Sequence, residues 1–95
     1  MTQFTATLWR WSGGNWHFVT LPADAADEIR FEAAGLRGGF GSIRVEVRVG
    51  ESVWRTSLFP DKQSGSFLLP IKKAIRIAEG LEADQPVTVS LEPVG

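Results

Sequence analysis

The side chains that could do chemistry in this chain are few and form no recognisable catalytic set. His17 is the only histidine and cysteine is absent, which excludes thiol catalysis, thiolate metal sites and disulfides. One histidine and scattered carboxylates do not complete a metal coordination shell. No serine lies in a nucleophile-elbow motif, and nothing gives His17 the positioned partner that a general base needs. We expect a rim histidine, no metal and no cofactor.

The acidic side chains cluster at a spacing that favours a solvated helix face over acid–base catalysis. The cluster is Asp24, Asp27, Glu28 and Glu32. Negative charge near the start of a helix interacts favourably with the helix dipole. Nothing in the sequence places two of these carboxylates across a bond, as glycoside hydrolysis requires, so we expect surface residues.

Basic side chains form a candidate anion contact. Lys72, Lys73 and Arg76 lie in an expected helix, and Arg37 opens a glycine-rich connector whose backbone N–H groups could hold an anion. Positive charge in the first turn of a helix is unfavourable by about 0.3–1 kcal/mol, and such local conflicts sometimes mark function. The alternative is an ordinary solvated surface, with Glu79 three residues beyond Arg76.

Aromatic side chains form a second candidate surface. A turn over residues 12–15 that pairs Trp11 with Trp16 creates a hairpin with apolar side chains on both faces. One face carries Trp9, Trp11, Trp16 and Phe18, and the other carries Phe4, Ala6, Leu8, Val19 and Leu21. Both faces should be covered. The simplest arrangement packs the first helix over the tryptophans, and a homodimer contact or a ligand cleft are the alternatives.

Alternating patterns predict the elements that position these side chains. We expect strands over residues 4–11, 16–21, 43–49, 52–58, 66–69 and 87–91, and helices over about 22–35 and 71–80. A two-residue type II′ turn at Gly50-Glu51 would set Val47 opposite Trp54 and Glu46 opposite Arg55. The fold expected is mainly β, a small six-stranded closed or pseudo β-barrel with two short capping helices.

Length and charge narrow the class of protein. Ninety-five residues suit a single domain spanning 1–95. Ten basic and eleven acidic residues give a net charge of −1, which argues against nucleic acid as a partner. No apolar run is long enough to span a membrane, and the opening residues lack the features of a signal peptide. We therefore expect a cytoplasmic protein with no membrane partner.

Five motifs follow one another along nearly the whole chain. They are Trp16-x-Phe-Val-x-Leu-Pro22, Gly41-Ser42-Ile43-x-Val45-x-Val47, Thr56-Ser57-Leu58-x-Pro60, Gly65-x-Phe67-x-Leu69-Pro70 and Val87-x-Val89-x-Leu91. In this order they resemble the bacterial domain of unknown function 1905 family. The resemblance implies a small double-split-type barrel with helical caps, and it transfers no site because the family has no established activity.

These observations lead to three functional hypotheses. The first is a non-catalytic binding or interaction module that meets a small ligand or a protein partner at the aromatic hairpin or a barrel mouth. The second is a single-stranded nucleic-acid or anion-binding barrel, because small barrels with aromatic and basic surfaces can bind single strands. The third is a small enzyme whose site is assembled by tertiary contacts alone.

Overall fold

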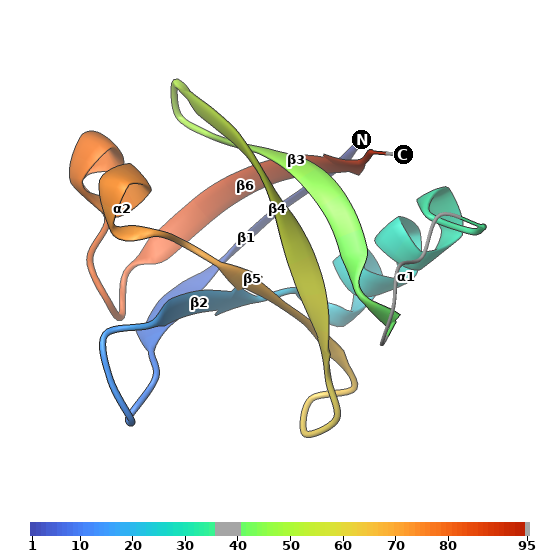
Figure 1. Ribbon diagram of the computed structural model, residues 1–95, viewed down its shortest axis with the longest axis horizontal. Helices are drawn as coiled ribbons and strands as arrows, with labels where there is room; N and C mark the ends of the chain where they lie inside the picture. The colour runs from blue at the N-terminus through green and yellow to red at the C-terminus, as the bar shows by residue number, and fades with distance from the viewer. Residues whose placement is uncertain (36–40, 95) are drawn as a thin grey trace.

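The computed structural model describes residues 1–35 and 41–94, and within them six strands close into a barrel with two helices (Figure 1). Around the barrel the strand order is β1-β2-β5-β4-β3-β6, and each neighbouring pair is antiparallel. The elements are β1 (Thr2–Arg10), β2 (His17–Thr20), α1 (Ala23–Glu32), β3 (Ile43–Val49), β4 (Ser52–Asp61), β5 (Ser66–Pro70), α2 (Lys73–Glu79) and β6 (Pro86–Pro93). The expected mainly β, six-stranded closed barrel is confirmed.

The turn between β3 and β4 sets the predicted register. Glu46 lies opposite Arg55, and the pairing runs to Val49 opposite Ser52, which leaves a two-residue loop. Gly50 has a φ of 57°, in the left-handed region that the first position of a type II′ turn requires and that glycine adopts without strain. The alternation of apolar and charged residues therefore stays in phase along both strands.

The barrel interior is filled by one face of every strand. Leu8 lies opposite Val19 in the β1–β2 pair, and Phe4 lies opposite Val89 in the β1–β6 pair. All four side chains are buried, as the alternation predicted. Phe67 on β5 is the largest side chain that is almost fully buried. The inner face of the aromatic hairpin is thus core.

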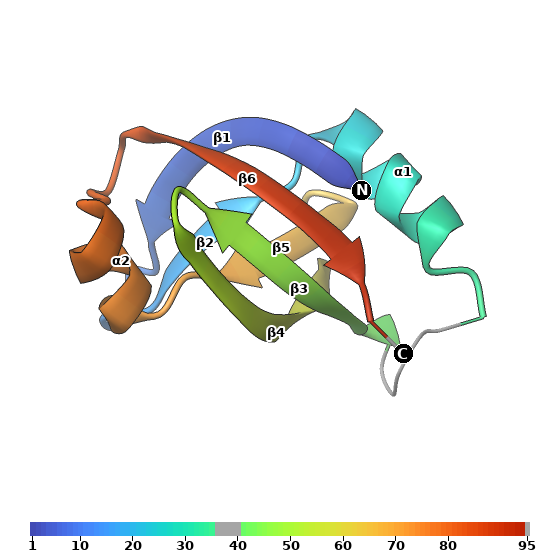
Figure 2. The same ribbon diagram turned by 90° about the horizontal axis from the view of Figure 1, so that it is seen from above.

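Helix α1 closes one end of this barrel, and α2 lies at the other end (Figure 2). The buried residues of α1 are Ala25, Ala26 and Ile29, so small side chains let the helix approach the strands closely. The helix follows Pro22 and ends at Glu32, which is shorter than the expected 22–35. Its Phe31 points into solvent and is 84% exposed.

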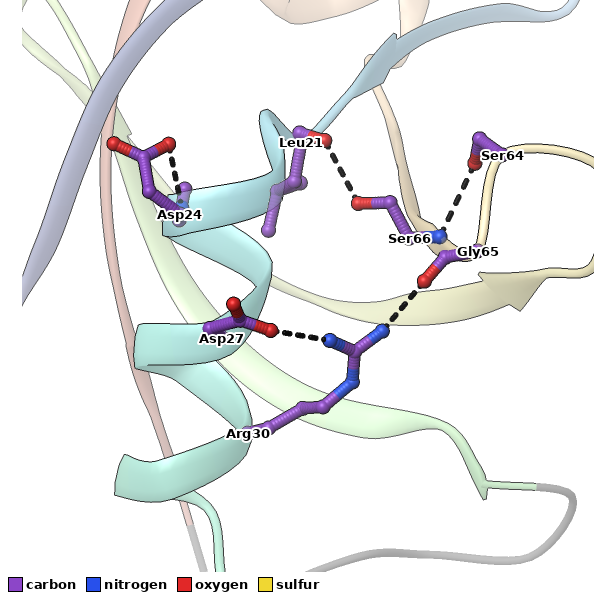
Figure 3. Close-up of polar contacts among 8 residues, drawn as sticks. Leu21, Asp24, Asp27, Arg30, Ser64, Gly65 and Ser66 are labelled. Atoms are coloured by element: carbon purple, nitrogen blue, oxygen red, sulfur yellow. Dashed lines mark hydrogen bonds and ion pairs between the residues drawn. The ribbon is translucent and has the colours of Figure 1, made fainter.

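Polar contacts fix α1 against the loop between β4 and β5 (Figure 3). The Arg30 guanidinium donates to Asp27 Oδ1 at 2.9 Å and to the Gly65 carbonyl at 2.6 Å. The buried Ser66 hydroxyl donates to the Leu21 carbonyl at 2.7 Å. These bonds hold the chain just before α1 and the last turn of α1 to the β5 side of the barrel end.

A second set of contacts ties α1 to the start of β1. The buried Thr2 hydroxyl lies 2.7 Å from Glu32 Oε1 and 3.0 Å from Glu28 Oε1. The Met1 amino group lies 2.7 Å from Glu32 Oε2. The amino group first and the Thr2 hydroxyl second lower the pKa of Glu32, so this contact strengthens the fold above the ordinary glutamate pKa and is lost as the pH falls further.

Helix α2 begins two residues later than predicted. Pro70 still belongs to β5, and the Ile71 N–H donates to the His17 carbonyl at 2.9 Å, which prolongs the β2–β5 pairing. Lys72 is the N-cap, and its side chain makes no capping hydrogen bond. Gly80 ends the helix with a φ of 64°, as expected of a C-terminal glycine. The helix therefore starts with a lysine at the position where serine or aspartate stabilises best.

The burial of α1 predicts the cost of truncating it. Ile29→Ala removes a fully buried side chain from the barrel end and should lower the free energy of unfolding by about 2–5 kcal/mol. Phe31→Ala, on the exposed side of the same helix, should change it by less than about 0.5 kcal/mol. Urea denaturation of both variants measures the difference. Equal effects would show that α1 does not plug the barrel.

The uncapped start of α2 predicts a stabilising substitution. Lys72→Ser should raise the free energy of unfolding by about 1 kcal/mol, because a serine hydroxyl accepts a hydrogen bond from the free N–H groups of the first turn. The matched control is Lys62→Ser in the exposed loop between β4 and β5, which should change nothing measurable. Urea denaturation measures both variants. A Lys72→Ser variant that is less stable than the wild type would contradict the assignment of residue 72 as the N-cap.

Candidate functional site

The outer side of the barrel carries a continuous apolar surface, which we call the aromatic face. It crosses four neighbouring strands, from β1 through β2 and β5 to β4. The four predicted residues, Trp9, Trp11, Trp16 and Phe18, all belong to it. Phe59, Leu68 and Pro70 complete it and were not predicted. The sequence signal for them was present, because β5 has apolar residues on both sides of the strand.

Ring contacts organise the centre of the aromatic face. The Trp9 and Phe18 rings lie opposite each other across the β1–β2 pair, with centroids 5.1 Å apart. Trp16 stacks on Phe18 at 6.1 Å with an interplanar angle of 12°. The Trp9 Nε1–H donates to the Thr20 hydroxyl at 2.9 Å, which satisfies its polar atom. Aromatic pairs of this kind add about 0.5–1.5 kcal/mol to simple burial.

The outer part of the aromatic face is open to solvent. Trp16 is 62% exposed, and Trp11 and Phe59 are each 48% exposed. The Trp11 ring lies over the hairpin turn, where a Cβ on Gly13 would collide with it. Gly13 therefore allows a large ring to lie flat against the turn while leaving its outer side uncovered.

The expectation that the first helix covers the tryptophans is wrong. Helix α1 buries its apolar side in the barrel end, where Ile29 is fully enclosed and Arg30 bonds to Gly65. This position lies away from the hairpin turn that carries Trp11 and Trp16 (Figure 1). Within the described chain no helix covers the aromatic face, and Trp11, Trp16 and Phe59 are exposed.

A pocket of about 470 Å³ adjoins the aromatic face, and we call it the basic pocket. Its cationic residues are Arg55, Lys72, Lys73 and Arg76, and its walls include Trp16, His17 and Trp54. The volume is within the range typical of small-molecule sites. Three of the four residues predicted for anion contact are therefore brought together. The fourth, Arg37, lies outside the described residues.

The pocket exists because β4 changes its neighbour. This strand pairs with β3 from Ser52 to Leu58, and with β5 only from Phe59 onwards. Before Phe59 the β4 edge separates from the chain that leads out of β5 into α2. Residues 54–56 of β4 and residues 70–73 line the pocket that occupies this gap. This local opening of the sheet could not be read from alternation alone.

The basic pocket has an unbalanced charge. No Asp or Glu lines it, and the ammonium groups of Lys72 and Lys73 form no ion pair or hydrogen bond with any described residue. The Arg76 Nε–H donates to the Ile71 carbonyl at 3.3 Å. Arg55 makes only a 3.4 Å contact with Glu46 on an exposed surface, which is worth little in free energy. Positive charge without an acidic partner in the lining therefore gathers around the pocket.

Glu79 does not neutralise this charge. It was the expected partner of Arg76, but its Oε2 accepts a hydrogen bond from the Ser52 hydroxyl at 2.6 Å, next to the β3–β4 turn. The contact attaches the end of α2 to β4. It also leaves Arg76 without an acidic partner among residues 1–35 and 41–94.

His17 lies in the wall of the basic pocket and is half-buried. Its Nδ1 is 2.8 Å from the Asn15 carbonyl, so Nδ1 carries a proton and donates it. The ring is oriented by this carbonyl, and Arg10 faces it across the β1–β2 pair. Within the described ranges no group of three His, Asp or Glu side chains could hold a metal ion.

Comparison with known proteins identifies the family of this chain. A family model described as Domain of unknown function (DUF1905) matches residues 4–91. The chain belongs to the DUF1905 family. No curated protein gives a significant match. The residues of the DUF1905 domain that the structure describes include no helix that is long and apolar enough to cross a membrane.

The exposure of two tryptophans in this DUF1905 chain predicts its fluorescence. Replacing Trp11 and Trp16 by phenylalanine should remove most of the emission that acrylamide quenches, because Trp54 is 8% exposed and Trp9 is partly buried. The matched control is Trp54→Phe, which should leave the quenchable fraction intact. If the Trp11 and Trp16 emission were protected from acrylamide at micromolar protein, another surface would already cover the aromatic face.

Proposed function

We propose that this domain is a non-catalytic binding module whose contact site is the junction between the aromatic face and the basic pocket. One observation carries the proposal: Trp16 lines both. An exposed indole beside unpaired cations offers stacking and charge to the same ligand. Exposed contiguous apolar surface of this kind marks interaction sites in proteins, and tryptophan is enriched where binding energy concentrates.

The chemistry of the junction supports binding over catalysis. Its side chains supply planar apolar surface, fixed positive charge and one histidine whose Nδ1 is already bonded to a carbonyl. General acid–base catalysis needs a histidine or carboxylate with a positioned partner and a nucleophile within reach. His17 faces lysine and arginine side chains across the pocket and has no carboxylate in the pocket lining.

Substitution of Trp16 tests the proposal. We would screen a metabolite panel and short oligonucleotides by thermal shift and tryptophan emission against the wild-type chain, Trp16→Ala and Trp16→Phe. Ligands found with the wild type should lose at least about tenfold in affinity with Trp16→Ala and much less with Trp16→Phe, because stacking is worth about 1–3 kcal/mol per ring. Phe31→Ala, an exposed aromatic on the far helix, is the matched control.

The opposite result would be equally clear. Ligands that bind Trp16→Ala as tightly as the wild type would remove the junction from the contact site. A chain that binds nothing in the panel, and instead protects Trp11 and Trp16 from acrylamide only at high protein concentration, would assign the aromatic face to a homodimer contact. Size-exclusion chromatography over the same concentrations separates these two outcomes.

A single-stranded nucleic-acid or anion-binding barrel is the second candidate. The observation that favours it is the separation of charge along the barrel. Helices α1 and α2 lie at opposite ends of the barrel (Figure 2). The acidic cluster belongs to α1, and three of the cations of the basic pocket belong to the start of α2 and its first turns. A net charge of −1 therefore does not prevent a local attraction for anions.

A further inference from the structure

We infer that the basic pocket receives the phosphate of a nucleotide unit, with its base stacked on Trp16. This rests on the proposed function and names the class of ligand. The ligand chemistry that we infer is a planar aromatic ring joined to a phosphate. It occurs both in free mononucleotides and in single strands, and the experiment below distinguishes the two.

The charge of the pocket selects a phosphate. Arg55, Lys72, Lys73 and Arg76 surround one volume that no carboxylate lines. Several cations around one cavity suit an anion that carries more than one charge and three exposed oxygens, such as a phosphate monoester. A carboxylate or a single phosphodiester, each with one charge and two free oxygens, would leave part of this positive charge without a partner, so a single strand would have to bring more than one phosphate to the pocket. Arginine in addition matches phosphate geometry with paired donors.

Two lysines sit in this pocket at a cost to the fold. Lys72 and Lys73 occupy the N-cap and the first position of α2, where positive charge is unfavourable and a capping side chain is missing. Both are exposed, and neither has an acidic partner within the described residues. Lysines that weaken the helix in the free protein are explained if their charges bind a ligand. The argument depends on these side chains and not on the short helix itself.

The aromatic wall selects a planar ring. Phe18 stacks on one side of the Trp16 indole, so a further ring can stack only on the opposite side. Trp16 also lines the basic pocket, which brings a ring stacked there within reach of the cations. Trp54 adds a second, buried indole to the wall. Bases stack on aromatic side chains with little dependence on sequence, so the pocket favours nucleotides as a class.

The test uses four probes on the full chain: adenosine 5′-monophosphate, adenosine, inorganic phosphate and a single-stranded oligothymidylate. Isothermal titration and tryptophan emission give the dissociation constants. We expect adenosine 5′-monophosphate to bind at least about tenfold more tightly than adenosine or inorganic phosphate alone, because ring and phosphate are bound together. An oligothymidylate that binds far more tightly than the mononucleotide would identify a strand as the source. Comparable affinities would identify the free nucleotide.

Charge variants separate binding from folding. Lys72→Ser should weaken adenosine 5′-monophosphate binding several-fold while making the protein more stable, so its effect cannot come from misfolding. Lys73→Gln combined with Arg76→Gln should weaken binding about tenfold or more, because each lost charge removes a charge-assisted contact. Lys62→Gln and Arg44→Gln, which lie outside the pocket, are the matched controls and should bind as the wild type does.

Three outcomes would overturn the inference. The first is adenosine binding as tightly as its monophosphate. The second is nucleotide binding that survives Lys72→Ser and the double variant unchanged. The third is failure of all four probes while other ligands bind in a Trp16-dependent way. The third outcome would leave the proposed binding function standing and remove only the nucleotide assignment. Loss of every Trp16-dependent ligand would remove both.

Discussion

Closure of the sheet is the constraint on which the rest of this structure depends. β1 must pair with β2 at one end and with β6 at the other, so Leu8 lies against Val19 and Phe4 against Val89 inside a single interior. Once the inward side chains fill that interior, no helix can enter through the wall, and α1 has to bury Ile29 at the barrel end. The outward side chains are then left for the surface, whatever their polarity.

Closure also creates the candidate site. The six-stranded barrel closes because the first part of β4, up to Leu58, pairs with β3 and its last part, from Phe59, pairs with β5. The opening before Phe59 forms the basic pocket. The outward aromatic rings of β1 and β2 lie next to this pocket, because Trp16 lines both surfaces. The same pairing that holds the fold together thus brings stacking surface and positive charge together, although neither contributes to the core.

The sequence predicted this fold where periodicity determines it. The alternation from Ile43 to Val49 and the glycine at position 50 allow only one register of β3 against β4 that keeps charged and apolar side chains on opposite faces. That register is observed. Prediction failed where tertiary contacts compete: the Ile71 N–H continues a strand pairing and delays α2, and the position of α1 depends on which surface of the barrel is open. Trp16 belonged to one candidate surface, and Lys73 and Arg76 belonged to another. Their convergence depends on where the β4–β5 pairing ends, which no local pattern encodes.

Trp16 belongs to two surfaces at once, and this has a thermodynamic consequence. Its indole is 62% exposed in the free chain, so fixing its orientation costs conformational entropy. A partner on the aromatic face that fixed the ring would spare that cost for an occupant of the pocket, or would block the pocket if it fixed the ring in the wrong orientation. By linkage the effect is mutual and equal in free energy. If both surfaces are occupied in this way, Trp16 would couple their occupancies without any movement of the barrel.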